Sequence, residues 1–136
     1  MTNSKVNVEL NKYLLGLGFS AKHLGFAFLR DCIKTITKDS AAAFFLTKNV
    51  YPHIAKKYDT TIPCIERNIR NAIERAWVSG ELKTIFKSCK KRPTNREAIA
   101  ILSDRAILLT HESIGLTKEV LDENRVEENN NKELVS

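Results

Sequence analysis

Residues 54–69 read Ile54-Ala55-Lys56-Lys57-Tyr58-Asp59-Thr60-Thr61-Ile62-Pro63-Cys64-Ile65-Glu66-Arg67-Asn68-Ile69, and this stretch predicts two helices joined by a tight turn. The small Ala55 permits the helices to cross closely, and Tyr58 and Ile65 are placed to pack between them. Asp59 stands where glycine is common, and aspartate tolerates the left-handed backbone better than most residues do. Thr61 is a suitable N-cap for the second helix. The spacing is that of a helix-turn-helix.

The second helix of this unit, about residues 62–79, has the strongest apolar periodicity in the chain. Its inward face is predicted to hold Ile65, Ile69, Ala72, Ile73 and Ala76, and Gly80 is predicted to end it. The N-terminal half then points Pro63, Glu66, Arg67 and Arg70 outward. In helix-turn-helix proteins this half of the second helix enters the major groove of DNA.

The rest of the chain predicts an all-α fold, a compact bundle of about six helices, because alternation of period two is nowhere sustained. A first helix over about residues 6–15 is expected to end at Gly16-Leu17-Gly18. Ser20 is expected to cap a second helix that reaches about Thr37, and a third helix is expected to begin near Ser40.

Prolines divide the remaining segments. Pro52 is expected to draw Tyr51 away from helical geometry and to separate a short helix over 51–58 from the segment before it. Another short helix is expected over 81–86, and Thr94 with Glu97 forms a capping box for a final helix. Its expected apolar surface consists of Ile99, Ile101, Leu102, Ile107 and Leu108.

Charge is unevenly distributed over the 136 residues, whose net charge is +6. Residues 112–136 contain seven acidic and three basic residues, so residues 1–111 carry nineteen basic against nine acidic residues, a net of +10. We therefore expect a folded domain over 1–111 with an anionic partner, followed over 112–136 by an acidic, Asn-rich, disordered tail.

Several classes of protein are not supported by the sequence. The longest apolar run, residues 41–46, is far shorter than the ~20 residues that span a bilayer, and there is no signal pattern, so a cytoplasmic, nucleoid-associated protein without membrane contact is expected. Three irregularly spaced cysteines and three dispersed histidines match neither a disulfide framework nor a zinc site. Phosphate-binding glycine loops and catalytic triads are also missing. We expect no metal, no cofactor and no enzymatic activity.

The outward side chains of the second helix suit base recognition. An Arg guanidinium can bind guanine O6 and N7, and a Glu carboxylate can accept from the cytosine amino group. Lys56, Lys57 and the basic run that includes Lys90, Lys91 and Arg92 can hold phosphates. Two alternatives stay open: Glu66, Arg67 and Arg70 form an ordinary solvated face with local ion pairs, and the basic run is a plain solvated loop.

Several short segments of this sequence closely resemble one family, the C-terminal effector domain of stage 0 sporulation protein A. That protein is a response regulator that governs entry into sporulation. The similarity extends over about residues 8–110. The matching segments are Gly25-Phe26-Ala27-Phe28-Leu29-Arg30, Tyr51-Pro52-His53-Ile54-Ala55-Lys56-Lys57-Tyr58, Ile65-Glu66-Arg67, Ile69-Arg70-Asn71-Ala72-Ile73-Glu74, Ala76-Trp77 and Arg92-Pro93-Thr94-Asn95.

The resemblance implies an all-helical domain that controls transcription and binds double-stranded DNA at boxes of the form T-G-N-C-G-A-A, often as a homodimer or tandem pair. RNA polymerase and a full-length homologue are further implied partners. Carried over by position, Glu66, Arg67 and Arg70 match recognition-helix residues of the family. The full expected DNA-binding set adds Lys56, Lys57, Thr61, Pro63, Cys64 and Asn71.

Two departures from the family pattern fall in the second helix. Pro63-Cys64 stands where the family usually has a Ser-Arg pair, and Asn71 stands where it often has His. If the missing Arg makes a bidentate guanine contact, its loss costs about 1–3 kcal/mol, so an altered box preference or a lower affinity is expected.

The family's regulators carry a receiver domain ahead of this module, whereas Met1 here lies almost at the first expected helix. This leads to the expectation of a stand-alone DNA-binding protein without a receiver domain. The alternative is an antagonist or protein-interaction module that competes or pairs with a full-length regulator, and the acidic tail and Pro63-Cys64 motivate it. A third hypothesis, nonspecific binding of nucleic acid or of an anionic surface, needs only the charge.

Overall fold

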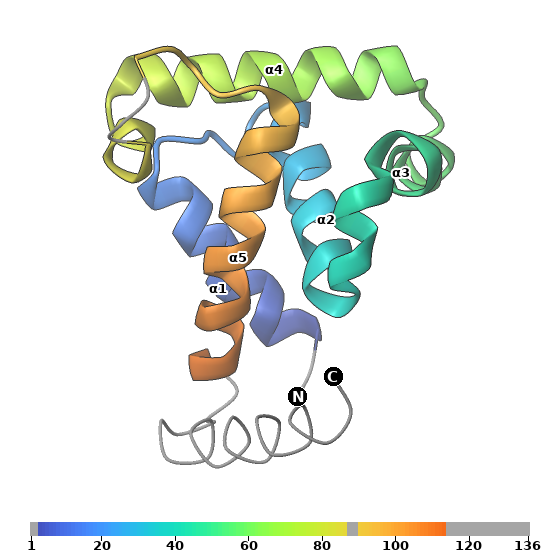
Figure 1. Cartoon of the computed structure of the whole chain (residues 1–136), viewed down its shortest axis with the longest axis horizontal. Helices are drawn as coiled ribbons and strands as arrows, with labels where there is room; N and C mark the ends of the chain where they lie inside the picture. The colour runs from blue at the N-terminus through green and yellow to red at the C-terminus, as the bar shows by residue number, and fades with distance from the viewer. Residues whose placement is uncertain (1–2, 87–89, 114–136) are drawn as a thin grey trace, which may run out of the picture.

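The computed structural model describes residues 3–86 and 90–113, and all regular structure in these residues is helical (Figure 1). The all-α prediction is confirmed, and five α-helices with three short helical segments are close to the expected six. The elements are α1 (Asn3–Gly16), α2 (Leu24–Lys38), the 3₁₀ helix η1 (Ser40–Phe45), the π-helical turn η2 (Leu46–Val50), α3 (Tyr51–Lys57), α4 (Ile62–Ser79), the 3₁₀ helix η3 (Leu82–Ile85) and α5 (Asn95–Ser113).

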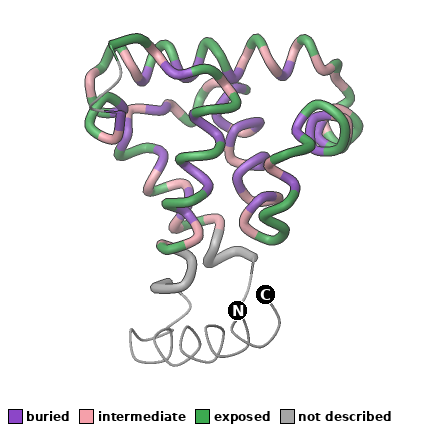
Figure 2. Tube along the Cα trace, in the orientation of Figure 1, coloured by how far each residue is buried: buried purple, intermediate pink, exposed green. Residues whose placement is uncertain are grey.

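Helix α2 lies at the centre of the arrangement and contacts α1, α3, α4 and α5. Helix α4 runs across one end of the molecule, above α2 and α5, and α3 lies beside α2 near the start of α4 (Figure 1). Burial follows this arrangement, because the side of α4 that faces α2 and α5 is buried whereas its outer side is exposed (Figure 2). The outer side of α4 is therefore a long, accessible surface, and the inner side of the same helix packs on α2 and α5.

The core between α2 and α4 is formed by fully buried aliphatic and aromatic side chains. Leu29 and Ile33 of α2 and Ile65, Ile69 and Ile73 of α4 have no exposed surface. The two helices approach closely at Gly25, where a Cβ atom would overlap the backbone oxygen of Asn68. This approach requires glycine on α2.

The bounds predicted for α4 are confirmed at both ends. The side chain of Thr61 accepts a hydrogen bond from the backbone N–H of Cys64 at 3.3 Å. Gly80 ends the helix with φ +98°, a left-handed conformation that glycine adopts without strain. All five residues predicted to face inward are buried.

The turn before α4 also has its predicted geometry. Asp59 has a positive φ of 52°, and the N–H of Thr60 donates to the carbonyl of Ala55 at 2.9 Å. The ring of Tyr58 packs edge-on against Phe28, with ring centroids 5.3 Å apart. The turn is thus held against the core by an aromatic contact as well as by its backbone.

Two expectations about helix starts are wrong. Ser20 does not cap α2, which begins at Leu24 after His23, because the carbonyl of Ser20 instead accepts from the His23 N–H at 3.3 Å in a backbone turn. This turn lets Phe19 and Phe26 both reach the core. The first helix begins at Asn3 rather than near Val6.

The segment around Pro52 differs from the prediction in its detail. Tyr51 keeps helical geometry, with φ −61° and ψ −43°, and the chain passes directly from η2 into α3. Proline is tolerated in the first turn of a helix, where its missing N–H would have no intrahelical acceptor. Pro52 therefore marks a change of helix type and not a break.

Helix α5 begins with the predicted capping box. The Thr94 N–H donates to Glu97 Oε1 at 2.9 Å, and the Glu97 N–H donates to Thr94 Oγ1 at 3.1 Å. Of the expected apolar surface, Ile99 and Leu102 are buried and Ile107 is half-buried. Ile101 and Leu108 are exposed, so the apolar face is narrower than predicted.

Helix α5 continues to Ser113, past the expected domain boundary at 111. Most of the expected acidic tail, residues 114–136, lies outside the described residues, as do residues 87–89 of the basic run. Within the described residues, no helix combines the length and the apolar character that crossing a membrane requires.

Candidate nucleic-acid interface

The exposed side of α4 is the surface on which the sequence places base recognition. Thr61, Pro63, Arg67, Arg70 and Asn71 are exposed there. Glu66 and Cys64 are half-buried. The side chains predicted to point outward therefore do so, with the carboxylate of Glu66 partly covered.

Arg67 and Arg70 are not engaged by the protein. Among residues 3–86 and 90–113, neither guanidinium forms a hydrogen bond or an ion pair. A guanidinium has five donors in a planar fork, and an exposed one can offer them to a partner. Among the described residues these two side chains have no local ion pair, and they lie on an exposed face.

Cys64 turns toward its own helix. The side-chain amide of Asn68 donates to the Cys64 carbonyl at 2.8 Å and contacts the Cys64 sulfur at 3.3 Å. Both partners lie one helical turn apart on α4, so this contact requires no tertiary arrangement. It fixes the thiol beside the exposed surface.

The structure brings the end of the basic run to α4. Arg92 Nη1 lies 3.7 Å from Glu74 Oε2, whereas Lys90 and Lys91 are exposed. Arg92 and Arg70 line a common hollow of about 310 Å³ between α4 and the start of α5. Sequence reasoning linked these residues only by charge, and the fold places them together.

Two residues of the first turn of α5 complete this hollow and were missed by the sequence analysis. Arg96 lines it, and the side-chain amide of Asn95 donates to the Glu66 carbonyl at 2.9 Å. The capping box predicts the first residue of α5, but it does not predict that the first turn of α5 contacts α4. The Asn95 contact ties the start of α5 to the backbone of α4.

The two lysines of α3 have different surroundings. Lys56 is exposed, whereas the ammonium of Lys57 lies 2.9 Å from Oδ2 of Asp31, a buried carboxylate on α2. Tyr58 donates its hydroxyl to the same oxygen at 2.6 Å, and Arg30 Nε donates to Oδ1 at 3.2 Å. Lys57, expected to hold a DNA phosphate, is thus partly committed to an internal ion pair.

Asp31 was not singled out from the sequence. Its signal is an acidic residue among apolar neighbours, between Phe28 and Cys32 on the buried face of α2. Burial raises the pKa of its carboxyl, but the hydrogen bonds from Tyr58 and Lys57 and the charge of Arg30 outweigh burial and lower the pKa below 3.8. Asp31 is therefore charged in the folded protein at neutral pH.

The Asp31→Asn substitution is expected to lower the free energy of unfolding by about 1–2 kcal/mol near neutral pH, because the donors Lys57, Tyr58 and Arg30 lose their charged acceptor. The folded pKa of Asp31 lies below the unfolded value of 3.8, so its contribution is present above that pH and is lost as the pH falls through the folded pKa. The difference between wild type and variant, measured by urea unfolding, should shrink below about pH 4.

The matched control is Asp104→Asn, an exposed aspartate on α5. Its effect on stability should stay within about 0.5 kcal/mol and should not depend on pH in the same way. An Asp31→Asn difference that is constant between neutral and acidic pH would contradict the assignment of the stabilisation to the Asp31 charge.

An all-helical domain that exposes unpaired arginines on one helix of a tight two-helix unit is typical of a DNA-binding domain. A family model described as "Sporulation initiation factor Spo0A C terminal" matches residues 10–106. The match covers well over half of the chain, so the chain belongs to this family, whose members are DNA-binding effector domains of sporulation regulators. The resemblance in the sequence is confirmed.

Proposed function

We propose that this protein is a sequence-specific transcriptional regulator that inserts α4 into the major groove of a T-G-N-C-G-A-A-like box. The observation that carries the proposal is the pair of exposed, unengaged guanidinium groups of Arg67 and Arg70 on the N-terminal half of α4. In helix-turn-helix domains this half of the second helix meets base edges.

The chemistry of the surface matches the bases of such a box. Arg67 and Arg70 can each bind guanine O6 and N7, and Glu66 can accept from the cytosine amino group. The hydrogen bond from Asn95 to the Glu66 carbonyl holds this part of α4 in place. A backbone held in place loses less conformational freedom when its helix meets the bases.

Phosphate contacts are proposed for the residues around this surface. Lys56, Lys90 and Lys91 are exposed and Arg92 is half-exposed beside α4. Phosphate contacts of these four residues would fix the position of the protein on the duplex without reading its sequence. The remaining members of the proposed DNA-binding set are Lys57, Thr61, Pro63, Cys64 and Asn71.

The wider assignments are proposals as well. We place DNA binding in residues 1–111, with pairing of two copies on adjacent boxes, contact with RNA polymerase and a location at the nucleoid in the cytoplasm. The match to a family of sporulation effector domains supports them.

The test is fluorescence anisotropy of the chain on a duplex with two T-G-N-C-G-A-A boxes and on a scrambled duplex, at about 50 and 200 mM salt. A preference for the boxes that survives the higher salt is the expected result. Equal binding to both duplexes with a steep salt dependence would replace the proposal with nonspecific binding. Binding to neither duplex would leave a protein-interaction module as the function.

A further inference from the structure

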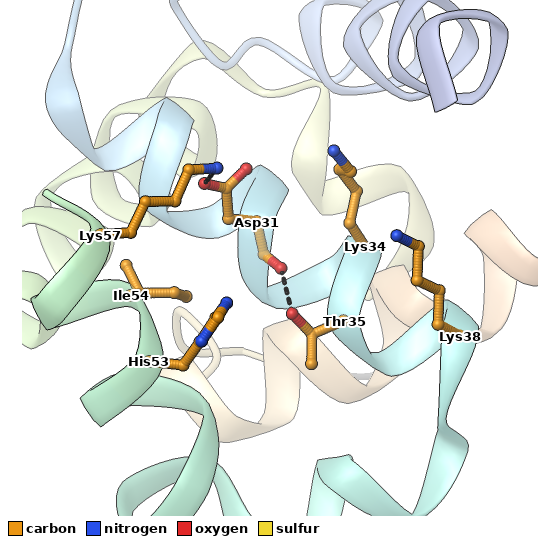
Figure 3. A pocket seen from close by; sticks show the side chains of 7 residues that line it. All are labelled: Asp31, Lys34, Thr35, Lys38, His53, Ile54 and Lys57. Atoms are coloured by element: carbon orange, nitrogen blue, oxygen red, sulfur yellow. Dashed lines mark hydrogen bonds and ion pairs between the residues drawn. The ribbon is translucent and has the colours of Figure 1, made fainter. Parts of the chain in front are cut away.

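A second concentration of positive charge lies between α2 and α3. A pocket of about 160 Å³ opens there, lined by Asp31, Lys34, Thr35, Lys38, His53, Ile54 and Lys57 (Figure 3). Of these residues, only Lys57 belongs to the set proposed to contact DNA. The pocket is therefore a feature separate from the base-reading side of α4.

Each of the two helices presents a pair of basic side chains one turn apart to this pocket. Lys34 and Lys38 come from α2, and His53 and Lys57 come from α3 on the opposite side (Figure 3). Lys34 and Lys38 carry like charges four residues apart, which destabilises a helix by a few tenths of a kcal/mol, so this pair costs stability in the free protein. An anion between the helices would reverse that cost.

The one carboxylate in the pocket does not neutralise these groups. Asp31 already accepts hydrogen bonds from Lys57, Tyr58 and Arg30. Within the described parts of the chain, Lys34 and Lys38 form no ion pair. Lys57 donates one of its three N–H groups to Asp31, which leaves two for another acceptor.

The surroundings of Lys34 disfavour its charged form, mainly because the side chain is partly buried. Burial lowers the pKa of its ammonium, and repulsion from Lys38, Lys57 and Arg30 lowers it further, against the opposing effect of Asp31. A bound anion would favour the charged form of Lys34.

We propose that this pocket is a phosphate-binding site. A phosphate group carries up to two negative charges and several acceptor oxygens, and lysine ammonium groups bind it as point charges. Donors from two helices surround the pocket, so one tetrahedral group can contact both helices at once. The group belongs either to the backbone of bound DNA or to a free phosphorylated molecule.

The first experiment contains no DNA, so it is independent of the proposed base recognition. Inorganic phosphate is titrated into ¹⁵N-labelled protein at constant ionic strength, and the amide signals of Thr35 and His53 are followed. We expect saturable shifts, and we expect the Lys34→Gln/Lys38→Gln double variant to bind phosphate at least tenfold more weakly. Glutamine keeps most of the aliphatic side chain and removes its charge.

The control variant is Lys12→Gln, which removes an exposed charge on α1. It should bind phosphate as the wild type does, and neither variant should unfold at a lower urea concentration than the wild type. Shifts that do not saturate, or saturable binding that is unchanged in the double variant, would overturn the proposal.

A second titration distinguishes the two sources of the phosphate. Inorganic phosphate is titrated again, now in the presence of a saturating amount of the two-box duplex. If the protein does not prefer the boxes, any duplex that it binds at low salt takes its place. Loss of phosphate binding would identify the group as a DNA backbone phosphate, and retained binding would identify it as part of a free phosphorylated molecule. Both results support the site, and each names its occupant.

Discussion

Replacing Gly25 with alanine is expected to destabilise the domain by about 3 kcal/mol. The added Cβ would overlap the backbone oxygen of Asn68 and would lie 2.9 Å from the Cβ of Ala72, both on α4. These atoms belong to the backbone and to the shortest side chain, so neither can rotate away, and α2 and α4 would have to separate. Urea unfolding followed by circular dichroism measures the effect.

The matched control is Gly16→Ala at the end of α1. A Cβ there meets no atom within 4 Å, so the same substitution should be neutral or stabilise by up to about 1 kcal/mol through helix propensity. Similar unfolding curves for the two variants would show that α2 and α4 are not in the close contact described above.

The Arg67→Ala substitution is expected to weaken binding to the two-box duplex by about 2 kcal/mol, or about thirtyfold, and to weaken binding to a scrambled duplex much less. The physical reason is the loss of a bidentate guanine contact, which only the correct base provides. Anisotropy at fixed salt on both duplexes measures the affinity and the preference together. Arg67 is exposed, and among the described residues its guanidinium forms no hydrogen bond or ion pair, so the variant should unfold like the wild type.

Arg75→Ala removes the same charge from an exposed position in the C-terminal half of α4 and serves as the control. It should lower affinity for both duplexes to the same small extent and leave the preference intact. If Arg67→Ala also weakened both duplexes equally, Arg67 would contact phosphate and another side chain would read the base.

The parts of the fold that were predictable are those governed by local interactions. Thr61 caps a helix three residues before its partner N–H, Gly80 provides a positive φ, and Thr94 and Glu97 satisfy each other within one turn. Each of these depends on neighbours in sequence. The all-α class and the bounds of α4 followed for the same reason.

The parts that escaped prediction depend on contacts between distant segments. Ser20 has the side chain of an N-cap, but the need to bury both Phe19 and Phe26 decides the course of the chain there. The pairing of Asp31 with Lys57 spans α2 and α3, and the hydrogen bond from Asn95 to Glu66 spans α5 and α4. Apolar periodicity predicts which face of a helix is buried, but it does not predict which element packs against that face.

The same division applies to the candidate interface. The exposure of Arg67, Arg70 and Asn71 was predictable from the apolar stripe on the other side of α4. The partial commitment of Lys57 to Asp31 and the position of Arg92 beside Glu74 were not, because a sequence shows charge but not distance.

The carboxylate of Asp31 has a consequence for protein engineering. The carboxylate on α2 accepts hydrogen bonds from Lys57 at the end of α3 and from Tyr58 in the turn that follows it. A graft of residues 51–79 onto another scaffold would leave both donors without their acceptor and α4 without its close neighbour at Gly25. The smallest transplantable unit therefore begins with α2, and chimeras that exchange box preference between relatives should take their first crossover before Leu24.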